Sequence, residues 1–234
     1  MEFGGQAVLV TGAAGNLGHA VANVFSERGA NLVLVDLDRK TLAQRFGDED
    51  AHRLFVAADL GGQHDANRVA DAAMARFGRI DVLCNIAGGF RMGEPVHETS
   101  DATWQFLFDL NAGSVLHMAR AIVPHMLASG GGRIVNVAAY AATKANANMG
   151  AYSASKSVVI RLTEAMAAEL REQRINVNCV LPTIIDTPAN RKAMPDADPG
   201  RWVAPEDLAR IIVFLASPAA RAIHGAAIPV TGLS

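Results

Sequence analysis

The sequence predicts an α/β fold in which a single doubly wound parallel sheet of seven strands carries helices on both faces. Short β-branched runs alternate with segments of helical periodicity along the whole chain, which is the pattern of βαβ units. The predicted strands are apolar throughout, as expected for strands buried on both faces. Half of the 234 residues are hydrophobic and only 19% are charged. The chain can therefore bury a large core, and one domain spanning residues 1–234 is expected.

The elements are expected in chain order from these patterns. Seven apolar runs predict strands at residues 7–10, 32–35, 54–56, 80–84, 134–137, 175–181 and 227–230. Apolar residues at helical spacing predict helices between them, from Leu17 to a stop at Gly29, after residue 35, from Val69 to a stop at Gly78, and at 100–129, 152–172 and 208–215. Residues 183–204 contain or adjoin four prolines and are predicted to form an irregular substrate lid, since loops of that length are usually functional.

Composition excludes several classes of function. The formal net charge of −2 and the scattered basic residues do not favour nucleic-acid binding, which requires a basic surface. Cys84 and Cys179 lie in apolar runs and suggest neither a disulfide framework nor a metal site, and the seven histidines show no ligand spacing. Residues 3–26 lack charge, yet polar residues and glycines interrupt them too often for a membrane span or a signal peptide. We therefore expect a soluble, cytoplasmic protein that acts on a small molecule without metal, membrane or nucleic acid.

A turn of small residues, Thr-Gly-Ala-Ala-Gly-Asn-Leu-Gly, occupies residues 11–18 between the first strand and the first helix. Small residues allow the backbone to approach a pyrophosphate, whose charge is stabilised by free N–H groups at the helix start. The absence of acidic residues from this stretch favours such an anion site. A tight turn without a ligand is the structural alternative. The residues expected to hold a dinucleotide here are Gly12, Ala14, Gly15, Asn16, Leu17 and Gly18.

Asp36 ends the second predicted strand, eighteen residues after Gly18. A carboxylate at this place can accept hydrogen bonds from both hydroxyls of an adenosine ribose, although it could also cap the following helix. The same carboxylate would repel a 2′-phosphate, and Leu37 supplies no compensating cation. The sequence therefore favours NAD(H) over NADP(H), with Arg39 as the cation near enough to oppose that preference.

Tyr152 and Lys156 are four residues apart at the start of a predicted helix, so their side chains share one face. A phenol with a pKa near 10 is a poor acid–base group at pH 7, and a neighbouring ammonium favours the phenolate. Such a pair could exchange a proton with a substrate oxygen. An ordinary amphipathic helix surface is the alternative for two residues at this spacing.

Taken together, these motifs make the chain resemble the short-chain dehydrogenase/reductase family over nearly its whole length. Tyr-Ser-Ala-Ser-Lys at residues 152–156 matches the Y-x-x-x-K motif. The turn resembles T-G-x-x-x-G-x-G with Asn16 in place of the middle glycine, and we expect Asn16 to preserve the turn because asparagine tolerates the left-handed conformation. Asn-Ile-Ala-Gly at 85–88 resembles N-N-A-G with its second asparagine replaced.

The resemblance implies a Rossmann fold, a nicotinamide dinucleotide cofactor and an assignment of roles. Tyr152 would be the general acid/base, Lys156 would lower the pKa of Tyr152 and bind the nicotinamide ribose, and Asn111 would hold a water of the proton relay. The further cofactor contacts implied are Asp59 and Leu60 at the adenine, Asn85, Ala87 and Gly88 after the fourth strand, and Pro182, Thr183 and Ile185 near the nicotinamide amide. In this family the helices at 100–129 and 152–172 pack against their copies, so a homotetramer or homodimer is expected.

The sequence departs from the family at the position of its catalytic serine, which is Ala139 here. Losing one donor from a site of developing charge typically costs about 10²–10³ in rate. Three explanations compete: a catalytically weak NAD-binding sensor, a replacement group from the following loop, or a substrate that does not need the serine. Thr143, Asn146 and Asn148 are candidates for the replacement, and Thr187 is a further candidate for lining the substrate mouth.

The leading hypothesis is an NAD(H)-dependent oxidoreductase acting on a carbonyl/alcohol pair. The alternative of a pterin or other C=N substrate rests on a regional resemblance to dihydropteridine reductases, which lack this serine, keep the tyrosine and lysine, and carry a segment similar to residues 186–195 with a tryptophan like Trp202 soon after it. A non-redox use of NAD, as in epimerases or dehydratases, is disfavoured because only about fifty residues follow Leu181, too few for their separate substrate domain.

Overall fold

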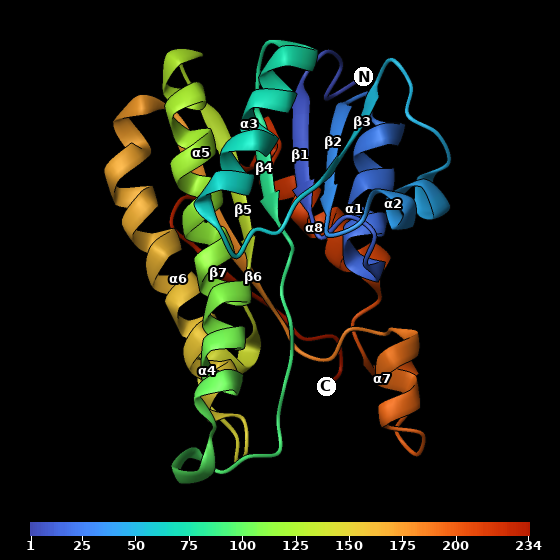
Figure 1. Ribbon diagram of the computed structural model, residues 1–234, viewed down its shortest axis with the longest axis vertical. Helices are drawn as coiled ribbons and strands as arrows, with labels where there is room; N and C mark the ends of the chain where they lie inside the picture. The colour runs from blue at the N-terminus through green and yellow to red at the C-terminus, as the bar shows by residue number, and fades with distance from the viewer.

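A computed structural model describes all residues, 1–234. Seven parallel strands form one sheet in the order β3-β2-β1-β4-β5-β6-β7 (Figure 1). The strands are β1 (Ala7–Thr11), β2 (Asn31–Asp36), β3 (Arg53–Ala57), β4 (Val82–Asn85), β5 (Gly132–Val137), β6 (Ile175–Pro182) and β7 (Ala227–Val230). The predicted doubly wound α/β class is confirmed, and each strand lies at its predicted run with ends that differ by at most a few residues.

Eight helices accompany the sheet: α1 (Asn16–Glu27), α2 (Arg39–Phe46), α3 (Gln63–Phe77), α4 (Asp101–Phe108), α5 (Ser114–Ala128), α6 (Gly150–Leu170), α7 (Pro188–Ala193) and α8 (Pro205–Leu215). One hydrophobic cluster joins the sheet to α1 and α8, and a second joins its other face to α3, α5 and α6. The sheet is therefore the middle layer of three. No helix is both long enough and apolar enough to cross a bilayer.

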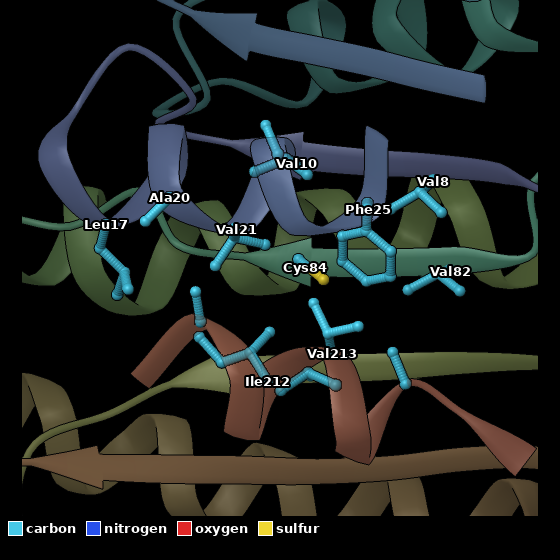
Figure 2. Close-up of a cluster of buried hydrophobic side chains, with 14 of the residues drawn as sticks. Val8, Val10, Leu17, Ala20, Val21, Phe25, Val82, Cys84, Ile212 and Val213 are labelled. Atoms are coloured by element: carbon cyan, nitrogen blue, oxygen red, sulfur yellow. The ribbon is translucent and has the colours of Figure 1, made fainter. Parts of the chain in front are cut away.

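Successive side chains of β1 pack into the hydrophobic clusters on opposite faces of the sheet, because side chains alternate across a strand. Val8 and Val10 join the cluster under α1 and α8, whereas Leu9 joins the other. Figure 2 shows the first of these clusters, in which strand side chains meet Phe25 of α1 and Ile212 of α8. Burying each such side chain contributes about 1.5–3 kcal/mol, which explains why the strands read as continuous apolar runs.

The strand order places a reversal of winding between β1 and β4. The chain passes from β1 outward through β2 and β3, then returns to lay β4 on the other side of β1. In open α/β sheets, ligands bind outside the carboxyl ends of the strands at this point. The Thr11 hydroxyl at the end of β1 accepts hydrogen bonds from the N–H groups of Ile86 and Ala87, at 3.0 and 3.1 Å. The loops after β1 and β4 are thereby joined.

The expected continuous helix at 100–129 is interrupted. A π-helical segment, Asp109–Gly113, separates α4 from α5. A π turn holds an additional residue, and such segments occur frequently at functional sites. The buried Asn111 lies in this segment.

The expectation that residues 183–204 are irregular is wrong in part. Thr187 accepts a hydrogen bond from the Asn190 N–H at 3.2 Å, and Pro188 opens α7. A threonine cap followed by proline is a helix-start signal, and the many prolines obscured it. A short 3₁₀ turn, Pro199–Arg201, follows, and Ile185 pairs with Val203.

Candidate active site

The turn between β1 and α1 requires glycine at two positions. Gly12 has φ of +64°, and a Cβ there would lie 2.9 Å from the backbone of Ala87. A Cβ at Gly18 would lie 2.1 Å from the Gly12 carbonyl oxygen. The approach at Gly12 brings the turn against the loop after β4, whereas the approach at Gly18 packs the turn against the start of α1. The resemblance places cofactor contacts on both the turn and that loop.

The expectation that Asn16 adopts a left-handed conformation is wrong. Asn148 and Arg174 are the only non-glycine residues with positive φ, and Asn16 is the first residue of α1. Asparagine therefore occupies this position without backbone strain. Its side-chain oxygen accepts a hydrogen bond from Arg45 Nη2 at 3.2 Å.

The helix start fits an anion. The N–H groups of Asn16, Leu17 and Gly18 have no acceptor within the protein, and no acidic residue lies in the first turn of α1. Free N–H groups and the positive end of the helix dipole together favour a bound phosphate. The residues present at this end therefore suit the diphosphate of a dinucleotide.

Asp36 lies beside the same turn. Its Oδ2 accepts a hydrogen bond from the Ala14 N–H at 2.9 Å, and its Oδ1 accepts one from the Leu37 N–H at 2.8 Å. The capping alternative is excluded, because Asp38 caps α2 by accepting from the N–H groups of Lys40 and Thr41. Both Asp36 oxygens retain further lone pairs for ribose hydroxyls.

Arg39, the cation that could oppose the preference for NAD(H), is engaged elsewhere. Its guanidinium forms an ion pair with Glu49 and donates a hydrogen bond to the Phe55 carbonyl at 2.9 Å. These contacts tie it to the β3 side of α2. It forms no hydrogen bond or ion pair with Asp36.

At the place that the resemblance assigns to the adenine, Asp59 Oδ1 accepts a hydrogen bond from the Gly61 N–H at 3.0 Å, and the buried Leu60 follows it. The Leu60 carbonyl is hydrogen-bonded to His117 Nδ1 at 2.8 Å. These bonds fix the loop after β3. That strand pairs with β2, and Asp36 at the end of β2 lies opposite Ala57 at the end of β3.

Lys156 and Asn111 converge beside Gly88. A Cβ at Gly88 would lie 2.9 Å from Lys156 Nζ and 3.0 Å from Asn111 Oδ1. Lys156 is buried and donates a hydrogen bond to the Val137 carbonyl at 2.9 Å. The absence of a side chain at Gly88 therefore leaves both polar atoms facing the same space.

The Asn111 amide is fixed on both sides. Its Oδ1 accepts a hydrogen bond from the Gly89 N–H at 2.8 Å, and its Nδ2 donates to the Gly89 carbonyl at 3.1 Å and to Ser155 Oγ at 3.0 Å. The Ser155 hydroxyl in turn donates to the Tyr152 carbonyl at 2.8 Å. Sequence reasoning missed Ser155, although its spacing of three from Tyr152 places it near that side of the helix.

Tyr152 lies in the first turn of α6, and its ring packs edge to face against Phe90, with centroids 4.8 Å apart. Burial raises the pKa of Tyr152 to about 12 and lowers the pKa of Lys156 to about 8. The expected lowering of the tyrosine pKa by the ammonium is not found. Desolvation dominates, and Lys156 Nζ is bound to the Val137 carbonyl.

The position of the family's catalytic serine is occupied by the buried Ala139. The Thr143 hydroxyl donates to the Tyr140 carbonyl at 2.8 Å, and Thr187 caps α7. Asn146 is exposed. Asn148 has φ of +61°, and its carbonyl accepts from the Gly93 N–H at 3.0 Å. Both threonine hydroxyls are thus used locally.

Asn148 borders a cavity of about 350 Å³ between the loop after β4 and the start of α6. Phe90, Met92 and Met149 line it on the apolar side, and Glu94 contributes a carboxylate. Since Phe90 also contacts Tyr152, the cavity adjoins the Tyr152 ring across the Phe90 side chain.

Two of the expected cofactor contacts, Asn85 and Thr183, have hydrogen-bond partners within the protein. The Asn85 amide is buried and donates to Asn136 Oδ1 at 2.8 Å, within the sheet. Pro182 ends β6. The Thr183 hydroxyl is hydrogen-bonded to the Thr231 carbonyl at 2.9 Å and to Ser234 Oγ at 2.7 Å, and Ile185 is half-buried beside it.

Fold and site together define a doubly wound α/β protein with an anion-binding turn and a tyrosine–lysine pair at one edge of its sheet. Comparison with known proteins agrees. The sequence pattern of the short chain dehydrogenase family matches residues 6–198. The chain is 38% identical to D-threitol dehydrogenase of Mycolicibacterium smegmatis, covering 97% of this chain and 92% of that protein. It is 34% identical to NAD-dependent glycerol dehydrogenase of Listeria innocua, covering 94% and 90%.

Solved structures share the fold of this chain. A short-chain type dehydrogenase/reductase from Mycobacterium ulcerans superimposes with a TM-score of 0.94 at 26% identity, over 100% of this chain and 90% of the other. The 3-ketoacyl-(acyl-carrier-protein) reductase of Brucella melitensis, solved in complex with NADH, has a TM-score of 0.88 at 31% identity and 98% coverage of both chains. The protein belongs to the short chain dehydrogenase family and is an oxidoreductase with a nicotinamide cofactor.

Proposed function

We propose that the protein interconverts an alcohol and a carbonyl compound with NAD(H) as cofactor and Tyr152 as general acid/base. The convergence of Lys156 and Asn111 beside Gly88, one helical turn from Tyr152, carries this proposal. When bound, the nicotinamide supplies the hydride for reduction or accepts it in oxidation. The remaining chemistry is proton transfer, which falls to the protein.

The elevated pKa of Tyr152 assigns it a protonated resting state. With a pKa of about 12, the phenol is neutral at pH 7 and can donate its proton to a developing alkoxide. For oxidation it must accept a proton instead, so a nearby positive charge has to favour the phenolate. Lys156, with a pKa of about 8, is mostly protonated at pH 7, so it would supply that charge and would also hold the ribose of a bound cofactor.

The preference for NAD(H) over NADP(H) is supported by Asp36. Its carboxylate is fixed beside the turn at residues 11–18, which we call the phosphate turn. Arg39 is paired with Glu49. A 2′-phosphate placed there would meet the like charge of Asp36, and such juxtaposed like charges disfavour binding.

A small polyhydroxylated alcohol is the substrate class that the relatives favour. Two of them are named for D-threitol and glycerol, both polyols. The cavity beside Phe90, which offers carboxylate, amide and thioether groups, is of a size that suits such a molecule. The relatives give no support to a pterin substrate. The intact Tyr152, Lys156 and Asn111 argue against a sensor without turnover.

Steady-state assays with NAD⁺ or NADP⁺ and a panel of polyols and cyclic secondary alcohols test this function. We expect NADH formation with at least one polyol, and a kcat/KM at least about tenfold higher with NAD⁺ than with NADP⁺. Tight NADH binding without turnover of any alcohol, or of the matching ketones in reverse, would favour the sensor instead.

A further inference from the structure

The phosphate turn receives its only positive side chain from another helix. Residues 3–26 contain no charged side chain, and α1 has no acidic residue in its first turn and no basic residue in its last turn. Arg45, in the last turn of α2, reaches the turn instead. Its Nε donates to the Ala14 carbonyl at 3.1 Å, and its Nη2 donates to Asn16 Oδ1 at 3.2 Å.

No acidic side chain neutralises this guanidinium. Arg39, on the same helix, is paired with Glu49, whereas Arg45 forms no ion pair. Arg45 lines a surface groove together with Glu27 and Glu206, and neither carboxylate forms a hydrogen bond or ion pair with it. The charge of Arg45 is therefore available to an anion at the turn.

The Ala14 peptide is held from both sides. Asp36 Oδ2 accepts a hydrogen bond from the Ala14 N–H, and Arg45 Nε donates a hydrogen bond to the Ala14 carbonyl. The Asp36 carboxylate, which suits the ribose, and the Arg45 guanidinium thus lie on either side of Ala14. Three free N–H groups follow at Asn16, Leu17 and Gly18, so Arg45 lies beside the expected diphosphate position.

Asn16 and Arg45 form a matched pair. Asn16 occupies a position where the T-G-x-x-x-G-x-G pattern has glycine, and a glycine could not hold the second guanidinium nitrogen. The asparagine oxygen fixes the direction of the arginine side chain, whose conformational freedom would otherwise oppose a defined position.

We propose that Arg45 is a cofactor-affinity residue, positioned by Asn16, whose charge stabilises the diphosphate of the bound dinucleotide. The inference rests on the proposed use of NAD(H). In this proposal Arg45 interacts with the phosphates and not with the adenosine. Its charge should therefore strengthen the binding of phosphorylated ligands only.

Equilibrium binding of NADH, ADP and adenosine to the apoprotein, measured by calorimetry, tests this role. For Arg45→Gln we expect the Kd of NADH and of ADP to rise about five- to twentyfold at low salt, because a partly exposed charge at a helix start contributes on this scale. The Kd of adenosine should change less than about twofold. The loss for ADP should shrink at high salt, since screening weakens a charge interaction. Arg45→Lys, which keeps the charge, should restore most of the affinity.

Lys40→Gln is the matched control. Lys40 is an exposed cation on α2, and its side chain forms no hydrogen bond or ion pair with the turn. Its removal should leave all three Kd values within about twofold of wild type. Both variants should keep the wild-type thermal midpoint.

A double-mutant cycle tests the positioning by Asn16. In the Asn16→Gly background, Arg45→Gln should weaken ADP binding by a smaller factor than in wild type, because coupled residues are not additive. Additive effects would overturn the positioning. Equal weakening of ADP and adenosine, or unchanged ADP binding by Arg45→Gln, would overturn the role of Arg45 while leaving the proposed function intact. Failure of the wild-type protein to bind either NADH or ADP would instead overturn the proposed function itself.

Discussion

Burial governs the ionisation of the two side chains that the mechanism needs most. Tyr152 and Lys156 are both desolvated, which raises the pKa of the phenol and lowers that of the ammonium. Desolvation shifts both equilibria toward the neutral form. At pH 7 the phenol is therefore neutral, whereas the ammonium is still mostly charged.

A pH-dependent stability follows for Lys156. Its pKa in the folded protein is about 8 against 10.5 when unperturbed, so between these values the unfolded chain binds more protons and the free energy of unfolding rises with pH. Lys156→Met removes this dependence. The stability of the variant minus that of wild type should be largest below about pH 8 and fall by about 3 kcal/mol by about pH 10.5.

Denaturant unfolding of both proteins at a series of pH values measures this difference. Tyr152 titrates in both proteins and cancels. A difference that stays constant across the range would show that the Lys156 pKa is not depressed.

Ala139 provides a second residue-scale prediction. Restoring a hydroxyl with Ala139→Ser should raise kcat for ketone reduction by about tenfold, part of the 10²–10³ that one donor contributes at a site of developing charge. The Kd of NADH should not change. An unchanged or lowered kcat in steady-state assays would indicate a substrate that does not need this donor.

At the scale of elements, the turn between β1 and α1 is the most constrained segment. A Cβ at Gly18 would lie 2.1 Å from the backbone oxygen of Gly12, so Gly18→Ala must displace the turn or α1. We expect a loss of about 1–3 kcal/mol in unfolding free energy and an NADH Kd at least about tenfold higher, since the N–H groups would move.

Gly62→Ala is the control for that substitution. A Cβ at Gly62 meets no atom within 4 Å, and its φ of −126° is accessible to alanine. Its stability should stay within about 1 kcal/mol of wild type. Wild-type NADH affinity in Gly18→Ala would contradict the tight packing of the turn.

Strands and most helices could be predicted because each depends on a local pattern. Apolar runs such as residues 32–35 give strands directly, and Gly29 and Gly78 end their helices as expected. The π segment at Asp109–Gly113 could not be predicted, because it changes the backbone without interrupting the apolar periodicity. The cap at Thr187 was present in the sequence but was outweighed by the surrounding prolines.

The candidate site was predictable in its residues but not in its contacts. Tyr152, Lys156, Asn111 and Asp36 were all identified from motifs. The contact between Arg45 and Asn16 joins residues twenty-nine apart and has no local signal. The direction in which the Tyr152 pKa shifts depends on burial, and spacing along a helix does not reveal burial.

At the scale of the whole molecule, the strand order determines where the chemistry takes place. The reversal between β1 and β4 brings the phosphate turn and the Gly88 loop to one edge. Helices α5 and α6 then supply Lys156 and support Asn111 from the other side of that edge. The site thus combines residues from both halves of the sheet.

The outer helices lead to a prediction about assembly. Trp104 of α4 and Leu116 of α5 are large apolar side chains left partly exposed, in the segment expected to pack against its copy. Light scattering should give two or four times the chain mass of 24.6 kDa. A monomer at micromolar concentration would refute the homodimer or homotetramer.

The central claim is that the Tyr152 hydroxyl exchanges the proton while NAD(H) exchanges the hydride, and Tyr152→Phe tests it most directly. The measurement is the rate of NADH formation with the best polyol substrate, beside the Kd of NADH. We expect the rate to fall at least about 10²-fold while the Kd stays within about twofold of wild type. A phenylalanine variant that turns over at the wild-type rate would contradict the account.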